Sequence, residues 1–122
     1  MDTENNNYSL GEVTLSNGIK ILTIQMEDKS RYLIATFLSS DIQGANPKYA
    51  LDAIDSVLMG DRKYAELNGN VCGVEVYKET TTIYDNLAED GKGDWCTIKT
   101  KNLRELIVSW YEDNQEFTAK QK

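Results

Sequence analysis

Histidine is absent from this sequence of 122 residues, which also contains only two cysteines and one proline. Without histidine, the chain lacks the side chain most often used as a general acid or base near neutral pH, and no Ser–His or Cys–His nucleophile pair can form. The sequence also lacks the G-x-S-x-G, H-E-x-x-H, P-loop and G-x-G-x-x-G motifs. These absences favour a protein that is not an enzyme and that binds no cofactor.

The two cysteines, Cys72 and Cys96, do not form a C-x-x-C pair. A zinc site with four cysteine or histidine ligands cannot be assembled from them. Each lies among apolar or β-branched residues, where reduced cysteine packs as a small hydrophobic side chain. We therefore expect two reduced, buried cysteines and no metal site.

Positive charge is scarce, because 20 acidic residues face 13 basic ones and the net charge is −7. Such a surface does not attract nucleic acid or anionic lipid, so neither nucleic acid nor a membrane is an expected partner, whereas a basic protein is. The chain contains no apolar run of about 18 residues that could span a bilayer, and its N-terminus lacks the features of a secretion signal. We expect a cytoplasmic protein.

The length fits one domain, residues 1–122, whose polar first residues, 1–8, are expected to fray. The Asn17-Gly18 pair predicts a tight hairpin turn between two strands, because these residue types adopt positive φ angles. Apolar residues on both faces of the second strand predict that it is covered on part of both faces. Residues 32–38, YLIATFL, predict a third strand, with a helix as the alternative.

Asn46-Pro47 predicts the start of a helix with one apolar stripe, and Gly60 predicts its end. The polar residues 61–70, DRKYAELNGN, are turn-like and could add a short helical turn, so they are left unassigned. The runs VCGVEVYK and TTTIYDNL predict a second hairpin with Tyr77 close to its turn. WCTIK predicts a strand from Trp95 to Lys99.

Thr100 reads as the N-cap of a last amphipathic helix that ends near Phe117, and the aromatic residues at helical spacing within it are expected to pack in the core. The resulting element order is ββ-β-α-ββ-β-α. It predicts an α+β fold, in which a mostly antiparallel sheet of about six strands carries two amphipathic helices.

The segment from Tyr84 to Asp94, YDNLAEDGKGD, contains four carboxylates against one cation. Aromatic side chains beside such charges can anchor a partner protein while the carboxylates orient it. The predicted partner-binding residues are Tyr77, Tyr84, Asp85, Glu89, Asp90, Asp94 and Trp95. The alternative is a solvated acidic loop, with Trp95 in the core. A second set of acids, Asp52, Asp55 and Asp61, is interpreted as the solvated side of the first helix.

The run DWCTIKTKNLRELIVSWYEDNQEF, residues 94–117, is a strand followed by a Thr-capped helix with a tryptophan at its midpoint. It resembles the C-terminal parts of small immunity proteins from bacterial polymorphic toxin and contact-dependent growth inhibition systems. The resemblance implies a cytosolic antidote, either a monomer or a one-to-one heterodimer with one cognate toxin domain. That toxin is frequently a basic nuclease, whose active site or substrate surface the antidote covers. The resemblance implies no residue-level site.

Two other functions fit the same charge balance. An acidic mimic of nucleic acid would inhibit a DNA-binding enzyme through carboxylates spaced regularly over one elongated face. An enzyme without histidine would need two carboxylates in one cleft, one of them with a raised pKa. The inhibitor of a basic toxin is the leading hypothesis. It needs only a local acidic patch, so a map of the surface charge would distinguish it from the mimic.

Overall fold

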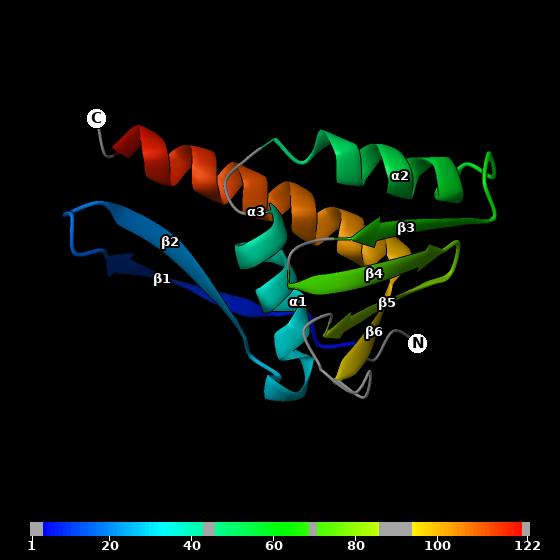
Figure 1. The fold of residues 1–122 in the computed structure, drawn as a ribbon, viewed down its shortest axis with the longest axis horizontal. Helices are drawn as coiled ribbons and strands as arrows, with labels where there is room; N and C mark the ends of the chain where they lie inside the picture. The colour runs from blue at the N-terminus through cyan, green and yellow to red at the C-terminus, as the bar shows by residue number, and fades with distance from the viewer. Residues whose placement is uncertain (1–3, 43–45, 69–70, 86–93, 121–122) are drawn as a thin grey trace.

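The computed structural model describes residues 4–42, 46–68, 71–85 and 94–120 (Figure 1). These residues form six strands in two antiparallel sheets together with three α-helices, which confirms the α+β class. In chain order the elements are β1 (Tyr8–Thr14), β2 (Lys20–Met26), the 3-10 turn η1 (Lys29–Arg31), α1 (Tyr32–Thr36), the π-helical segment η2 (Phe37–Ile42), α2 (Lys48–Leu58), β3 (Tyr64–Asn68), β4 (Cys72–Tyr77), β5 (Thr80–Asp85), β6 (Trp95–Lys99) and α3 (Thr100–Lys120).

The core lies between the helices and one face of the four-stranded sheet, whose strand order is β3-β4-β5-β6. Successive residues of a strand point to opposite faces, and here every second residue is buried. The buried positions are Ala65, Leu67, Cys72, Val74, Val76, Thr81, Ile83, Cys96 and Ile98. Helices α1, α2 and α3 all contact this face, and Trp110 of α3 is the largest fully buried side chain.

The strand expected at Tyr32–Leu38 is instead helical, and this prediction is wrong. Residues 32–36 form α1, and the chain continues without a break into η2. The buried side chains have helical spacing and form one stripe against the sheet: Leu33, Ile34, Phe37, Leu38 and Ile42. The local preference of aromatic and branched residues for strands is therefore overridden by burial of this stripe.

Strand β3 was not predicted, and it comes from the unassigned residues 61–70. Tyr64 and Glu66 are exposed, whereas Ala65 and Leu67 are buried, so this short stretch alternates with the period of a strand. It pairs with β4 over its whole length, with Tyr64 opposite Tyr77. The predicted β4–β5 hairpin and the strand Trp95–Lys99 are confirmed.

The first hairpin is confirmed, but its expected covering is not. Gly18 is the last residue of the turn, where its φ is +86° and its N–H donates to the Leu15 carbonyl at 2.9 Å. The strand ends beside this turn project beyond the helices (Figure 1). Their apolar side chains are exposed, at Val13, Leu15, Ile19 and Ile21. Farther along β2, Leu22, Ile24 and Met26 pack against the core, so the expected covering is found on one face only and not near the turn.

Both long helices begin where the sequence predicts. The Asn46 side chain accepts a hydrogen bond from the Lys48 N–H at 3.0 Å at the start of α2, and Gly60, with a φ of +85°, follows its end. Helix α3 begins at Thr100 and extends beyond Phe117 to Lys120. The Thr100 hydroxyl donates to the Tyr77 carbonyl, which ties the helix to the β4–β5 hairpin. None of the described helices is both long enough and apolar enough to cross a membrane.

The two cysteines are buried and not bonded to each other, as the sequence indicates. Burial raises the pKa of the Cys72 thiol to about 12 and also raises the pKa of Cys96. Near the N-terminus, the Glu4 carboxylate accepts hydrogen bonds from the Lys99 N–H at 2.7 Å and from the Asn102 side chain at 2.9 Å. These contacts attach residue 4 to the junction of β6 and α3.

Asp41 links η2 to the start of β4, and its loss is expected to destabilise the fold. Its carboxylate accepts hydrogen bonds from the backbone N–H groups of Val71 at 3.1 Å and Cys72 at 2.9 Å. Asp41→Ala leaves both donors without this partner and should lower the free energy of unfolding by about 2 kcal/mol, measured by urea denaturation. The control is Asp52→Ala, which removes only an exposed ion pair with Lys48 and should change stability by less than about 0.5 kcal/mol. Equal losses would contradict this role.

Candidate protein interface

The four-stranded sheet has a second face that no described element covers. The helices pack on the opposite face, and the side chains that alternate with the core residues are exposed or half-buried. We call this surface the open face. The strand register arranges its side chains in three rows: Tyr64, Tyr77, Thr80 and Lys99; Glu66, Glu75, Thr82 and Thr97; and Gly73, Tyr84 and Trp95.

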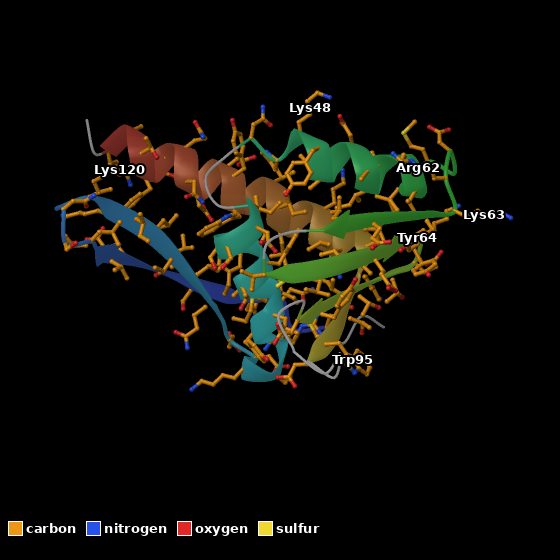
Figure 2. All side chains as sticks on the ribbon, in the orientation of Figure 1. Lys48, Arg62, Lys63, Tyr64, Trp95 and Lys120 are labelled. Carbon is orange, nitrogen blue, oxygen red and sulfur yellow. The ribbon has the colours of Figure 1, made fainter. Side chains whose placement is uncertain are left out.

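Aromatic side chains stand in the outer two rows of the open face. The rings of Tyr64 and Tyr77 lie 5.1 Å apart between centroids and are tilted by 44°. In the opposite row, Trp95 is 67% exposed and is directly paired with Tyr84 on the neighbouring strand. Figure 2 shows Tyr64 near the start of β3 and Trp95 near the start of β6. Trp95 is therefore a surface residue and not part of the core.

The Tyr84 ring lies across the backbone of β4 at Gly73. A Cβ atom placed on Gly73 would be 2.2 Å from Cζ of Tyr84, which is closer than any real contact. Only glycine leaves room for the ring in this position, and the ring in turn buries Gly73. This packing fixes the orientation of Tyr84 beside Trp95.

The middle row contains two carboxylates, Glu66 and Glu75, which are directly opposed on β3 and β4. Such cross-strand pairs have Cβ atoms about 5 Å apart. The Tyr64 hydroxyl donates to Glu66 Oε2 at 2.7 Å, and this bond, with the nearby negative charge, raises the pKa of Tyr64 to about 12. Burial, and then the charges of both glutamates, raise the pKa of Tyr84. The two carboxylates therefore form the electrostatic centre of the open face.

The structure brings together only part of the predicted set of partner-binding residues. Tyr77, Tyr84 and Trp95 share the open face. Asp85 and Asp94 lie one position beyond the Tyr84–Trp95 pair, where the Asp85 N–H donates to the Asp94 carbonyl at 2.9 Å. Asp85 is two residues after Ile83, and Asp94 is two residues before Cys96, so both are in register with the side chains that face the helices, at the edge of that face. Glu89 and Asp90 lie outside the described residues.

Asp94 contacts α1. Its carboxylate accepts a hydrogen bond from the Tyr32 hydroxyl, and this bond, with burial and the charges of Asp94 and Asp85, raises the pKa of Tyr32 to about 12.

In the other acidic set, Asp55 forms an ion pair with Arg104 of α3, with 2.6 Å between the carboxylate and Nε, and Asp52 pairs with Lys48. These two acids therefore have partners within the fold.

Sequence reasoning missed Tyr64, Glu66 and Glu75. Glu75 could have been found, because the alternation in CGVEVY places it on the same face as Tyr77. Tyr64 and Glu66 could not be placed, because β3 was left unassigned. The structure therefore moves the centre of the candidate interface from the acidic segment onto the strands.

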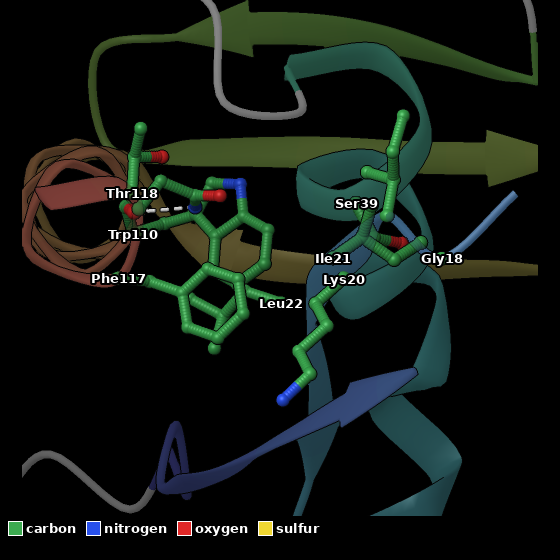
Figure 3. Close-up of a pocket in the computed structure, with 10 residues that line it drawn as sticks. Gly18, Lys20, Ile21, Leu22, Ser39, Trp110, Phe117 and Thr118 are labelled. Carbon is green, nitrogen blue, oxygen red and sulfur yellow. Dashed lines mark hydrogen bonds between the residues drawn. The ribbon is translucent and has the colours of Figure 1, made fainter. Parts of the chain in front are cut away.

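A second exposed surface lies between β2 and the C-terminal half of α3, where a cavity of about 730 Å³ opens (Figure 3). Trp110 and Phe117 stand on one side, and Lys20 and Ile21 stand on the other. Trp110 Nε1 is buried and has no hydrogen-bond partner among the described residues. Among the described residues, no carboxylate lines this cavity, so its chemistry is mainly apolar and differs from that of the open face.

The fold and the open face together define a small α+β protein in which one sheet face carries exposed aromatic side chains and two opposed carboxylates. A curated protein from Bacillus cereus, named "Immunity protein", is 45% identical to this chain over 110 residues. The alignment covers 90% of this chain and 91% of the relative. No family model and no solved structure matches the chain. The chain belongs to the family of this immunity protein.

The packing of Tyr84 on Gly73 is expected to be specific to glycine. Gly73→Ala should push the ring off β4 and expose apolar surface, lowering the free energy of unfolding by about 1 kcal/mol. Chemical denaturation of both single variants and the double variant measures the coupling. In a Tyr84→Ala background, Gly73→Ala should cause almost no loss, because no ring remains to be displaced. An equal loss in both backgrounds would show that the ring is not the cause.

Tyr32 and Tyr64 are expected to ionise well above the ordinary range of tyrosine in an alkaline titration, because the pKa of each is about 12. A folded-state pKa above the ordinary value near 10 means that their contribution to stability is complete below pH 10 and is lost as the pH rises from 10 to 12. Ultraviolet absorbance of tyrosinate measures the titration. Glu66→Gln should lower the pKa of Tyr64, and Asp94→Asn should lower that of Tyr32. A titration that neither variant changes would contradict the assigned hydrogen bonds.

Proposed function

We propose that this chain neutralises a cognate protein toxin by covering the toxin's active site or substrate-binding surface with the open face. The observation that carries this proposal is a sheet face left uncovered within the described residues. Three aromatic side chains there, Tyr77, Tyr84 and Trp95, offer contact area to a partner. Membership of an immunity protein family supports a toxin as that partner.

The toxin that fits this surface best is basic, and a nuclease is the most suitable class. A nuclease attracts phosphate groups with lysine and arginine, and the acidic open face would compete for the same cations. Opposite charges steer association over a distance of about 8 Å at physiological ionic strength. The aromatic rings, once buried, would supply most of the lasting affinity. The resemblance to polymorphic toxin and contact-dependent growth inhibition immunity proteins supports the same assignment.

The dimensions of the open face indicate that its edges also contribute. Four strands of five or six residues cover an area of roughly 20 Å by 17 Å, or roughly 340 Å². A standard interface buries about 800 Å² on each partner. Asp85 and Asp94 lie one position beyond the Tyr84–Trp95 pair, at the edge of this face. We propose that they extend the contact together with Glu89 and Asp90, which lie between them in the sequence. We propose a one-to-one complex in the cytoplasm, with no catalysis by this chain.

The alternatives have less support. A mimic of nucleic acid needs carboxylates repeated along an elongated face, whereas the open face has one pair between two aromatic rows. An enzyme with paired carboxylates needs them in a cleft, and among the described residues none of those that line the cavity between β2 and α3 is a carboxylate.

The proposal predicts that the exposed Trp95 contributes strongly to partner binding, whereas the exposed Tyr49 does not. The tagged chain would capture its partner from the source organism, and the purified partner should be a basic protein that is toxic without this chain. Trp95→Ala should weaken binding by about 30-fold, measured by calorimetry, because a tryptophan anchor that is buried on binding contributes about 2 kcal/mol. The matched control is Tyr49→Ala, since Tyr49 is 55% exposed on α2, which packs on the opposite face of the sheet.

Two results would contradict this interface. Trp95→Ala and Tyr77→Ala could both bind like the wild type, or Tyr49→Ala could cause the larger loss. Asp85→Asn/Asp94→Asn tests the edge separately, and should slow association and reduce its dependence on salt. An unchanged rate and salt dependence would remove these two residues from the interface.

A further inference from the structure

The carboxylates of Glu66 and Glu75 are directly opposed, and that of Glu66 also accepts a hydrogen bond from the Tyr64 hydroxyl at 2.7 Å. Among the ion pairs of the described residues, none includes either glutamate. Like charges placed opposite each other on neighbouring strands destabilise a sheet. The row continues with Thr82 and Thr97, so no cation stands in it. A positive group supplied from outside would relieve the repulsion between the two carboxylates.

The surroundings of the pair restrict the kind of cation that fits. Tyr64 and Tyr77 stand on one side of the two carboxylates, and Tyr84 stands on the other. A guanidinium group stacks on aromatic faces and donates hydrogen bonds from several N–H groups in one plane, so it can reach two carboxylates at once. An ammonium group is compact and strongly hydrated, and it lacks this planar arrangement. The combination of rings and opposed acids therefore suits arginine better than lysine.

We propose that Glu66 and Glu75 form the receptor for an arginine side chain of the partner protein, with the guanidinium between the two carboxylates and against the tyrosine rings. This assignment rests on the proposed function, because it places the arginine on the toxin. The rigid strands hold the carboxylates in position before binding, which limits the entropy lost on association. The arginine contact thereby selects partners at the centre of the open face.

The assignment predicts opposite effects on stability and on binding. Glu75→Gln removes the repulsion in the unbound chain and should raise its Tm by about 2 °C. The same change should weaken the arginine contact. A residue with only a structural role would not combine a stability gain with a binding loss, so a lower Tm for Glu75→Gln would overturn this part of the inference.

The direct test uses three synthetic peptides, hexa-arginine, hexa-lysine and hexa-citrulline, titrated into the full chain and followed by backbone amide NMR. Hexa-arginine should shift the amides of β3 and β4, hexa-lysine should bind at least about 3-fold more weakly, and the neutral citrulline peptide should cause no shift. Glu66→Gln/Glu75→Gln should weaken hexa-arginine binding by about 10-fold. Equal binding of the arginine and lysine peptides would overturn the choice of arginine.

The matched control is Glu105→Gln/Glu112→Gln, which changes the net charge equally at two exposed positions of α3. It should leave hexa-arginine binding within about 2-fold of the wild type, since general attraction falls only slightly. Equal losses for the two double variants would show non-specific attraction and overturn the receptor. If Glu66→Gln/Glu75→Gln still neutralises the captured toxin like the wild type, this inference fails and the proposed function stands. If the wild type binds hexa-arginine but neutralises no toxin, the proposed function fails instead.

Discussion

The alternation of side chains along the four-stranded sheet is the constraint on which the rest of the structure depends. Each strand sends every second side chain toward α1, α2 and α3, and these positions are buried almost completely. The intervening side chains then have to point away from the core. Because the described helices all pack on one face, the other face is left without a cover. The core and the open face are two consequences of one repeating pattern.

This arrangement separates the two exposed surfaces by their chemistry. The open face has an acidic pair among aromatic rings, whereas the hairpin tip exposes aliphatic side chains such as Val13 and Ile19. Charged groups on the open face act at a distance and affect the rate of association, but aliphatic contacts act only when water is excluded. The proposed basic partner would therefore be drawn to the open face first. The tip of β1 and β2 contributes no comparable attraction.

The sequence predicted those elements whose ends carry a specific local signal. Asn46-Pro47 and Gly60 mark α2, and the period-two patterns around Tyr77 and Trp95 mark β4, β5 and β6. Residues 32–38 were assigned wrongly to a strand. In a short, continuously apolar run, the spacing of polar and apolar residues does not distinguish a helix from a strand. Only part of the open face was predicted, for a different reason. Glu66 becomes a neighbour of Glu75 only through the pairing of β3 with β4, and β3 had been left unassigned.

A recognition surface built on strands can change its specificity without changing the fold. Outward side chains such as Glu75 and Tyr77 make few contacts with the core, so replacing them alters the face that a partner meets while Val74 and Val76 keep the sheet packed. The sheet cannot rearrange as a loop can, which means that the identity of each outward residue decides which partner fits.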